Sequence, residues 1–221
     1  MNRAKCLSMV AVAVAGLGTI MATSQPVRAD VIYTLDTFTG SGSPTAPPYG
    51  TVNLHQDGAN VDVTVTLTAG EGFVSTGAGA ALTWDLDGEP VVTIANLDLT
   101  HFAVSHNGTS TGNLDGTGSW FYQIDCISCG SGGSAPYPGP LTFTIDNITI
   151  ADFISNNKTA TGYLFASDIC TQMGVTGGCA GITGDVVASD LPSRSAPEPA
   201  PLALLGAGLL GLGVFGHRQR S

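Results

Sequence analysis

The fold of this chain is decided by residues 50–68, which read GTVNLHQDGANVDVTVTLT. Apolar residues alternate with polar ones on both sides of a short polar break, and they are Val52, Leu54, Val61, Val63, Val65 and Leu67. A period of two is the pattern of a half-buried strand. The break is Asp57-Gly58-Ala59-Asn60, a run of turn-forming residues. The stretch therefore predicts a hairpin of Gly50–Gln56 and Val61–Thr68.

Short runs of the same kind continue on both sides of this hairpin. They predict strands at Val31–Phe38, Ala81–Leu86, Pro90–Leu97, Leu99–Ser105, Ser119–Asp125, Leu141–Asp146, Asn147–Ile154, Gly162–Ser167 and Gly184–Ser189. No stretch between these runs has a sustained helical period. About ten short strands separated by Gly, Asn and Asp turns predict an all-β domain at residues 30–190, a β-sandwich of the jelly-roll or Ig-like type.

The distribution of charge separates this domain from the two ends of the chain. Sixteen of the seventeen acidic residues lie between Asp30 and Asp190, whereas residues 30–196 contain only two bases, Lys158 and Arg194, for a net charge of −14. Binding to nucleic acid or to anionic lipid needs clustered Lys and Arg, so both are excluded as functions. The same charge repels anionic polymers unless divalent cations bridge the two.

The N-terminus has the pattern of a cleavable export signal. Arg3 and Lys5 precede an apolar run, Leu7–Ala22, and a small-residue cleavage site follows at Val27-Arg28-Ala29. Residues 1–29 are therefore predicted to be a signal peptide that forms a helix before removal, with the mature chain beginning near Asp30. The alternative is a retained anchor, although the apolar run is shorter than the ~20 residues that a membrane span requires.

The C-terminus combines three features in a fixed order. A linker at residues 191–196 leads to Pro197-Glu198-Pro199, an uncharged run follows, and the chain ends in a basic tail with Arg218 and Arg220. As a helix, Leu202–Gly216 would be roughly 22 Å long at ~1.5 Å per residue, less than the ~30 Å hydrocarbon core. This segment is thus predicted to be a marginal transmembrane helix with its arginines in the cytoplasm and the acidic domain outside.

This tail, residues 197–221, resembles the PEP-CTERM sorting signal. The resemblance implies export across the inner membrane of a Gram-negative bacterium, transient anchoring there, and processing near Pro197-Glu198-Pro199 by a membrane-embedded exosortase. Proteins with this tail are associated with exopolysaccharide and with biofilm or floc formation, so the expected destination is the cell surface, the outer membrane or the extracellular matrix. A C-terminal anchor that is never cut is the alternative. Tyr49–Leu54, Gly72–Val74 and Leu141–Ile145 also look like other PEP-CTERM ectodomains, but carry no functional residues.

Four cysteines remain after removal of the signal: Cys126, Cys129, Cys170 and Cys179. An exported chain meets an oxidising compartment, so this even number predicts two disulfides, and of three connectivities the local pairs, each bracketing its own Gly-rich loop, are favoured. A four-thiolate zinc site is an alternative, but the second pair lacks the short spacing of zinc ligands. Thiol–disulfide exchange is another, but a Gly-Ser-rich loop follows Cys129 where a helix would be needed.

Signatures of catalysis are nearly absent. Gly108-Thr109-Ser110-Thr111-Gly112 matches the G-x-S-x-G pattern, yet the residues that follow predict a loop rather than the helix that a nucleophile elbow needs. His101 and His106 are five residues apart, so on one strand they would point to opposite faces and could not share a metal. We therefore expect that this protein is not an enzyme.

Three acids, Asp85, Asp87 and Glu89, alternate around a Gly turn. Oxygen ligands at this density suit calcium, although the spacing is not that of an EF-hand loop, and a solvated acidic turn is the plainer interpretation. Calcium is the one cofactor that the sequence suggests. The same acids could form a glycosidase pair, which spacing alone does not test.

Aromatic residues for sugar stacking are few. Trp84, Trp120 and Tyr122 could form one lectin-like platform, but core packing is the favoured interpretation. Asn107, Asn147 and Asn157 begin N-x-[ST] sequons, a weak signal in a Gram-negative bacterium. The expected function is that of an exported, non-catalytic cell-surface or exopolysaccharide-matrix protein. A carbohydrate- or calcium-dependent binding module is the alternative and a secreted hydrolase a remote one, and the sequence indicates no particular ligand.

Overall fold

The computed structural model describes residues 30–42, 44, 47–77, 80–112, 114, 116–155, 162–188 and 193–194. The predicted signal peptide, most of the linker and the whole sorting signal, including Pro197, Glu198, Pro199, Arg218 and Arg220, lie outside these residues. Within them, no helix has the length and apolar character needed to cross a membrane.

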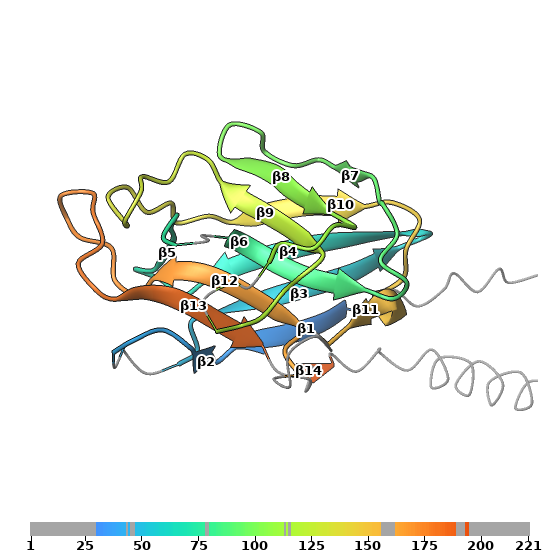
Figure 1. The fold of residues 1–221 in the computed structure, drawn as a ribbon, viewed down its shortest axis with the longest axis horizontal. Helices are drawn as coiled ribbons and strands as arrows, with labels where there is room; N and C mark the ends of the chain where they lie inside the picture. The colour runs from blue at the N-terminus through green and yellow to red at the C-terminus, as the bar shows by residue number, and fades with distance from the viewer. Residues whose placement is uncertain are drawn as a thin grey trace, which may run out of the picture.

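Two antiparallel sheets pack face to face, which confirms the prediction of an all-β, sandwich-like domain (Figure 1). In spatial order, sheet A contains β14 (Ser193–Arg194), β1 (Asp30–Leu35), β3 (Gly50–Asp57), β4 (Asn60–Leu67), β10 (Leu141–Ile145) and β7 (Ile94–Ala95). Sheet B contains β2 (Thr37–Phe38), β13 (Thr183–Ala188), β12 (Phe165–Cys170), β6 (Ala80–Leu86), β9 (Tyr122–Cys126) and β8 (Phe102–Asn107). Two short strands complete sheet B: β5 (Gly72–Phe73) pairs with β12, and β11 (Phe153–Ile154) pairs with β6.

The predicted hairpin is present as β3 and β4, and its register runs from Gly50 opposite Leu67 to Asp57 opposite Asn60. The loop is therefore only two residues long, and its first residue, Gly58, has φ 62°. A positive φ at this position is the pattern of a type II′ turn, whose twist suits a hairpin. The alternating Val and Leu side chains all point into the core.

An aromatic cluster joins the two sheets at the centre of the core. Trp84 of β6 stacks on Tyr122 of β9, with ring centroids 5.5 Å apart. From sheet A, Phe143 of β10 approaches Trp84 to 5.3 Å, and Tyr33 of β1 approaches Phe165 of β12 to 5.1 Å. Large aromatic side chains buried in this way contribute much of the free energy that holds two layers together.

Several predicted strands are shorter than the sequence pattern suggested. The run Val31–Phe38 breaks at Asp36, whose N–H donates to the carbonyl of Val187, and the chain passes there from sheet A to sheet B. Only Ile94–Ala95 of the predicted strand Pro90–Leu97 is paired, since Pro90 has no N–H to donate and Asn96 takes a positive φ of 58°.

The predicted strand Asn147–Ile154 is mostly wrong. Asn147 has φ 58°, which ends the extended run, and a 3₁₀ turn, η1 (Ile150–Asp152), follows. Asp152 and Thr149 form a reciprocal capping box around this turn, so the local hydrogen bonds replace strand pairing. Only Phe153 and Ile154 pair with a strand, as β11.

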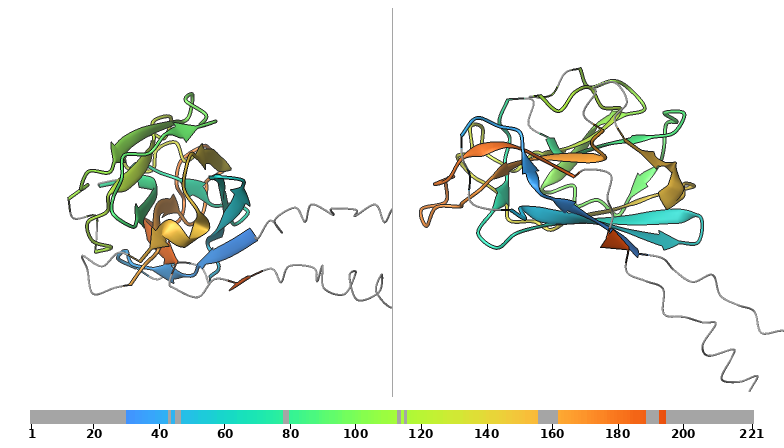
Figure 2. Two further views of the ribbon diagram at one scale, coloured as in Figure 1. Left: turned by 90° about the vertical axis from the view of Figure 1, so that its right-hand side faces the viewer. Right: turned by 90° about the horizontal axis from the view of Figure 1, so that it is seen from below.

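Both described ends of the domain lie at one end of the sandwich. Asp30, the first residue of β1, is opposite His55, close to the β3–β4 turn, and β14 pairs with β1 so that Arg194 is opposite Val31. Figure 2 shows β1 and β14 side by side in two further views. We call this the entry end. A segment attached after Arg194 therefore leaves the domain beside its first strand.

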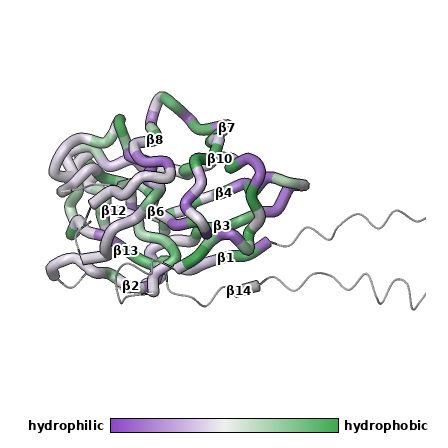
Figure 3. The backbone as a smooth tube through the Cα atoms, turned by 45° about the vertical axis from the view of Figure 1, so that its right-hand side comes forward, coloured by the Kyte–Doolittle hydropathy of each residue, from purple (hydrophilic) through white to green (hydrophobic). Residues whose placement is uncertain are grey.

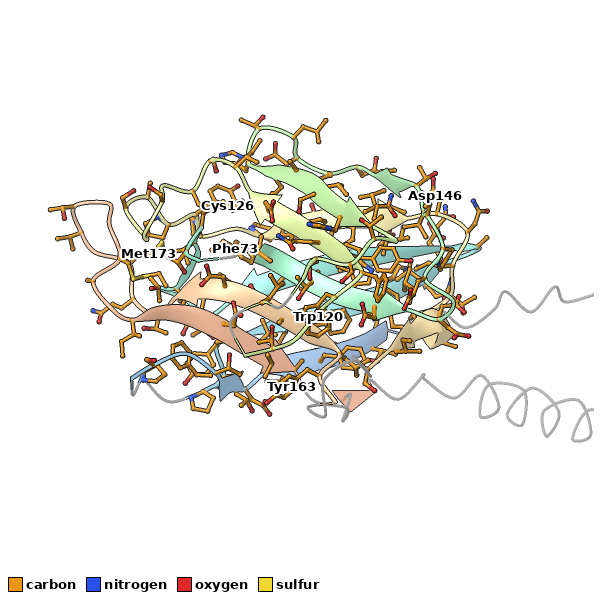
Figure 4. All side chains as sticks on the ribbon, in the orientation of Figure 1. Phe73, Trp120, Cys126, Asp146, Tyr163 and Met173 are labelled. Atoms are coloured by element: carbon orange, nitrogen blue, oxygen red, sulfur yellow. A yellow bond between two sulfur atoms is a disulfide. The ribbon has the colours of Figure 1, made fainter. Side chains whose placement is uncertain are left out.

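The four cysteines form two local disulfides, Cys126–Cys129 and Cys170–Cys179, the pairing that the sequence favoured. With their sulfurs bonded to each other, none of the four is a thiolate ligand of zinc in this structure. Both pairs lie at the end of the sandwich opposite the entry end, which we call the disulfide end; Cys126 and Met173 mark it in Figure 4. The disulfides indicate an extracytoplasmic, oxidising location.

Replacing both cysteines of a pair with Ala is expected to lower the free energy of unfolding in proportion to the chain entropy that the disulfide removes. The loss should be about 2.7 kcal/mol for Cys170–Cys179, which closes the longer loop, and about 1.9 kcal/mol for Cys126–Cys129. Urea unfolding of the oxidised protein measures both values. A larger loss from the shorter loop, or none from either, would contradict this account.

Candidate functional site

A pocket of about 660 Å³ opens on the outer face of sheet B, towards the disulfide end. We call it the β13 pocket. Segments from four parts of the chain line it, and they contribute Thr39, Gly40, Ser41, Thr76, Gly77, Gly116, Thr183, Gly184 and Asp185. The lining is thus made of hydroxyl groups, glycine backbone and one carboxylate. Its volume lies within the ~300–1,000 Å³ typical of sites for small molecules.

The alternation of β12 and β13 explains why acidic side chains face this pocket rather than the core. Val186 points inward to the main core, so its neighbour Asp185 points outward. In the antiparallel register Asp168 of β12 is directly opposite Asp185 of β13. Residues opposite each other in such a pair lie on the same face, which places two nearly buried carboxylates side by side.

Hydrogen bonds fix two threonines of the lining. The N–H and the hydroxyl of Thr76 both donate to Oδ2 of Asp168, at 2.8 and 2.6 Å. The N–H and the hydroxyl of Thr39 both donate to the carbonyl oxygen of Asp185, at 2.9 and 3.2 Å. The walls that come from the β2–β3 and β5–β6 connections are therefore attached to strands β12 and β13.

A second, smaller apolar cluster lies beside the pocket on the same outer face. It consists of Leu114, Trp120, Ala166 and Val187. Trp120 is fully buried, and its indole N–H donates to the Thr117 hydroxyl at 3.2 Å. Figure 4 shows Trp120 next to Tyr163, which packs against this cluster. The loop that carries Trp120 thus covers part of sheet B and leaves the pocket open next to it.

The three aromatic residues considered as a sugar platform are all core residues. Trp84, Trp120 and Tyr122 have no exposed surface. The Tyr122 hydroxyl donates to the carbonyl of Pro90. Burial, together with the charges of Asp85 and Glu89, raises the pKa of Tyr122 to about 12, so this hydroxyl stays protonated. None of the three faces solvent, and the platform is therefore excluded.

The structure does not gather the acidic loop into a metal site. Asp85 is 4% exposed, and its carboxylate accepts the N–H of Phe121 at 2.7 Å. Asp87 and Glu89 are exposed, and Glu89 takes a positive φ of 52°. Among the residues that the structure describes, no three His, Cys, Asp or Glu side chains form a group that could hold a metal ion. The described residues therefore give no support to the calcium site considered at Asp85, Asp87 and Glu89.

The residues considered for catalysis, Ser110, His101 and His106, each have a different hydrogen-bond partner. Ser110 lies in an exposed loop after β8, where the described residues that follow it form no helix, and its hydroxyl oxygen accepts the N–H of Gly112 at 3.4 Å. His101 binds the Asp98 carboxylate at 2.7 Å and stacks on Tyr137 with centroids 4.1 Å apart. That hydrogen bond is the main reason why the pKa of Asp98 is lowered. His106 contacts Thr109 instead.

Only one of the described sequons presents a free amide. Both side-chain atoms of Asn107 are used, because its Oδ1 accepts the N–H of Val92 and its Nδ2 donates to the Val92 carbonyl, at 3.0 and 2.8 Å. Asn147 is exposed. Asn157 lies outside the described residues. A sugar on Asn107 would thus be attached to an Nδ2 that already donates to the Val92 carbonyl.

One unusual group was not suggested by the sequence. Glu71 lies in the turn between β4 and β5 and is only 5% exposed, and no described residue offers its Oε2 a hydrogen bond. Burial raises the pKa of Glu71 to about 7. The pKa of Tyr49 is raised mainly by the burial of Tyr49 itself and, second, by the negative charge of Glu71. The flanking Gly70 and Gly72 predict only a turn, so the pattern gives no signal that this carboxylate is buried.

The chain matches no protein-family model, no curated protein and no solved structure.

Glu71 predicts a dependence of stability on pH. The pKa in the folded protein lies above the ordinary value of 4.5, so the folded state binds this proton more tightly than the unfolded chain does. The contribution of Glu71 to the free energy of unfolding is then fully present below pH 4.5 and is lost as the pH rises through about 7. Between about pH 5 and about pH 8, the free energy of unfolding of the native protein should fall by on the order of 2 kcal/mol more than that of Glu71→Gln. Urea unfolding at each pH measures both values. Parallel pH curves for the two proteins would refute this role.

Proposed function

We propose that this protein is an exported, non-catalytic cell-surface or exopolysaccharide-matrix protein that is sorted through its PEP-CTERM-like tail. The observation that carries the proposal is the pairing of β14 with β1. Arg194 lies only three residues before Pro197, so a tail held in the membrane attaches the sandwich by its entry end. The disulfide end then points away from the membrane (Figure 1).

The two disulfides fit this arrangement. They close two loops at the end that would be exposed to the exterior, where Ile127 and Val175 are exposed. Cys126–Cys129 follows β9, and Cys170–Cys179 follows β12. Cross-links of this kind stabilise loops that a small core does not reach. An outward-facing tip that is cross-linked suits a protein retained among extracellular polymers.

The route follows from the resemblance of the tail. The signal peptide directs export across the inner membrane, the short apolar segment holds the chain there, and an exosortase processes it near Pro197-Glu198-Pro199. The product is then released to the surface, the outer membrane or the matrix. For the sandwich itself we keep the jelly-roll or Ig-like type within this proposal.

A non-catalytic role is supported by how the reactive side chains are arranged. Ser110, His101 and His106 have separate partners, and His101 is stacked and paired with Asp98. A nucleophile needs a base within hydrogen-bonding reach. Hydrolysis is therefore kept only as a remote alternative.

A second candidate function is carbohydrate binding, and the β13 pocket is the observation that favours it. It is polar, open and close to the end that would face the exterior. The acidic loop at Asp85–Glu89, in contrast, is at the entry end, where β11 and η1 pack. A binding module would thus use the β13 pocket and not that loop.

The sorting proposal is tested by replacing Pro197, Glu198 and Pro199 together with Ala in the native bacterium. If exosortase reads this motif, the variant should stay unprocessed in the inner-membrane fraction, whereas the native chain should appear as a shorter product at the surface or in the matrix. Fractionation followed by mass measurement separates the two. Thr142→Val, an exposed change on sheet A, is the control. Identical size and location for all three proteins would overturn the proposal.

A further inference from the structure

The turn that carries Glu71 leads into the strand that joins two segments of the disulfide end. We call these the first tip segment, residues 126–140, and the second tip segment, residues 170–182. Strand β5 lies between them. Its Gly72 pairs with Cys170 at the start of the second segment. Its Phe73 exchanges two backbone hydrogen bonds with Tyr137 of the first, at 2.8 and 2.9 Å. A movement of this turn would therefore reach both segments.

Both chain neighbours of Glu71 are held by the tip segments. The carbonyl of Gly70 accepts the N–H of Met173 at 2.6 Å. Gly72 is packed so closely that an added Cβ would come within 2.8 Å of the Met173 sulfur and 3.0 Å of the Pro136 side chain. Figure 4 labels Phe73 and Met173 at this end of the domain. The closed position of the turn thus depends on its contact with Met173.

The carboxyl of Glu71 is buried at this junction without a compensating charge. The side chain is 5% exposed, and no described residue offers its Oε2 a hydrogen bond. The segments around it, residues 47–49, 68–74, 126–140 and 168–182, contain no Lys, Arg or His. The Gly- and Ser-rich loops at the disulfide end are mostly pale in Figure 3, in agreement with their lack of charged side chains.

The other titratable side chains of these segments do not neutralise an ionised Glu71. Apart from the cysteines, which are bonded in disulfides, they are Tyr49, Tyr137 and Asp168. The charge of Glu71 contributes to the raised pKa of Tyr49, after the burial of Tyr49 itself. Asp168 has the same sign of charge as Glu71. Tyr137 stacks on His101, whose ring is already bonded to a carboxylate of its own segment. Since an uncompensated buried charge is costly, ionisation favours movement of the Glu71 side chain into water.

The turn has the backbone freedom for such a movement. Glycine lies on each side of Glu71, and Gly70 has φ 93°, in a region that residues with a Cβ rarely adopt. Neither glycine has a side chain that must leave a packed site when the backbone rotates. The hydrogen bond from Met173 and the pairing of Gly72 are what hold the turn in place.

We propose that Glu71 is a pH-sensitive latch that holds the second tip segment against the turn at residues 68–71. With a neutral carboxyl, the turn stays closed on Met173. With an ionised carboxyl, the side chain leaves for water, the hydrogen bond between Gly70 and Met173 is lost, and the second tip segment loosens. The Cys170–Cys179 disulfide keeps the loosened loop tethered. This device goes beyond the proposed function and does not depend on how the chain is sorted.

The test is amide hydrogen exchange of the whole oxidised protein, followed by NMR from about pH 5 to about pH 8. Glu71→Gln keeps the size of the side chain and cannot ionise, so it is the closed reference. Burial raises the pKa of Glu71 from 4.5 to about 7. The exchange rate of the Met173 amide in the native protein, divided by that in Glu71→Gln, should therefore rise about fiftyfold over this range. Glu89→Gln, an exposed change of the same kind at the entry end, should exchange like the native protein.

A ratio for Met173 that stays constant with pH would overturn the latch. Equal protection of Met173 and of the amides of β3 and β4 at about pH 8 would also overturn it, because opening would then be unfolding of the whole domain. If Glu71→Gln does not fold, the native protein alone decides. The NMR signals of the Glu71 carboxyl carbon and the Met173 amide should titrate with one shared midpoint, near 7. Different midpoints, or a shared midpoint near 4.5, would contradict the proposal.

Discussion

The two sheets depend on each other, because the apolar inner face of each packs against that of the other. Phe143 against Trp84 and Tyr33 against Phe165 are two of the contacts that cross between them. This packing positions the parts of the domain that the proposed function uses. It leaves the outer face of sheet B free to carry polar groups, and it sets the entry end and the disulfide end at opposite ends of the strands (Figure 1).

The sequence predicted what depends on local pattern. The alternation in residues 50–68 and the turn at Gly58 both act within one hairpin, so the hairpin was found with bounds close to the observed ones. The strands near Asn96 and Asn147 were predicted too long, because a positive φ at an ordinary residue ends a strand without changing its apolar pattern. The break at Asp36 was also missed, because the change of sheets there depends on the hydrogen bond of its N–H to the carbonyl of Val187, which lies far away in the sequence.

The candidate site could not be predicted from the sequence, for a different reason. Asp168 and Asp185 are seventeen residues apart, and only the register of β12 and β13 brings them together. The aromatic residues were misleading in the opposite way. Trp84, Trp120 and Tyr122 are residue types that can stack on a sugar, but composition does not show whether their side chains are buried or exposed. Pairing of Cys126 with Cys129 and of the second pair was predictable, since each closes a short local loop. What results is an acidic sandwich whose polar pocket lies towards its disulfide end.

The most direct test of this account is the intact mass of the protein isolated from the native bacterium, before and after reduction. The account predicts a chain that begins near Asp30, ends near Pro197-Glu198-Pro199, and gains the mass of four hydrogens on reduction, because two disulfides are present. A chain that retains residues 200–221 in the mature product, or one with free thiols, would contradict export and sorting as the central function.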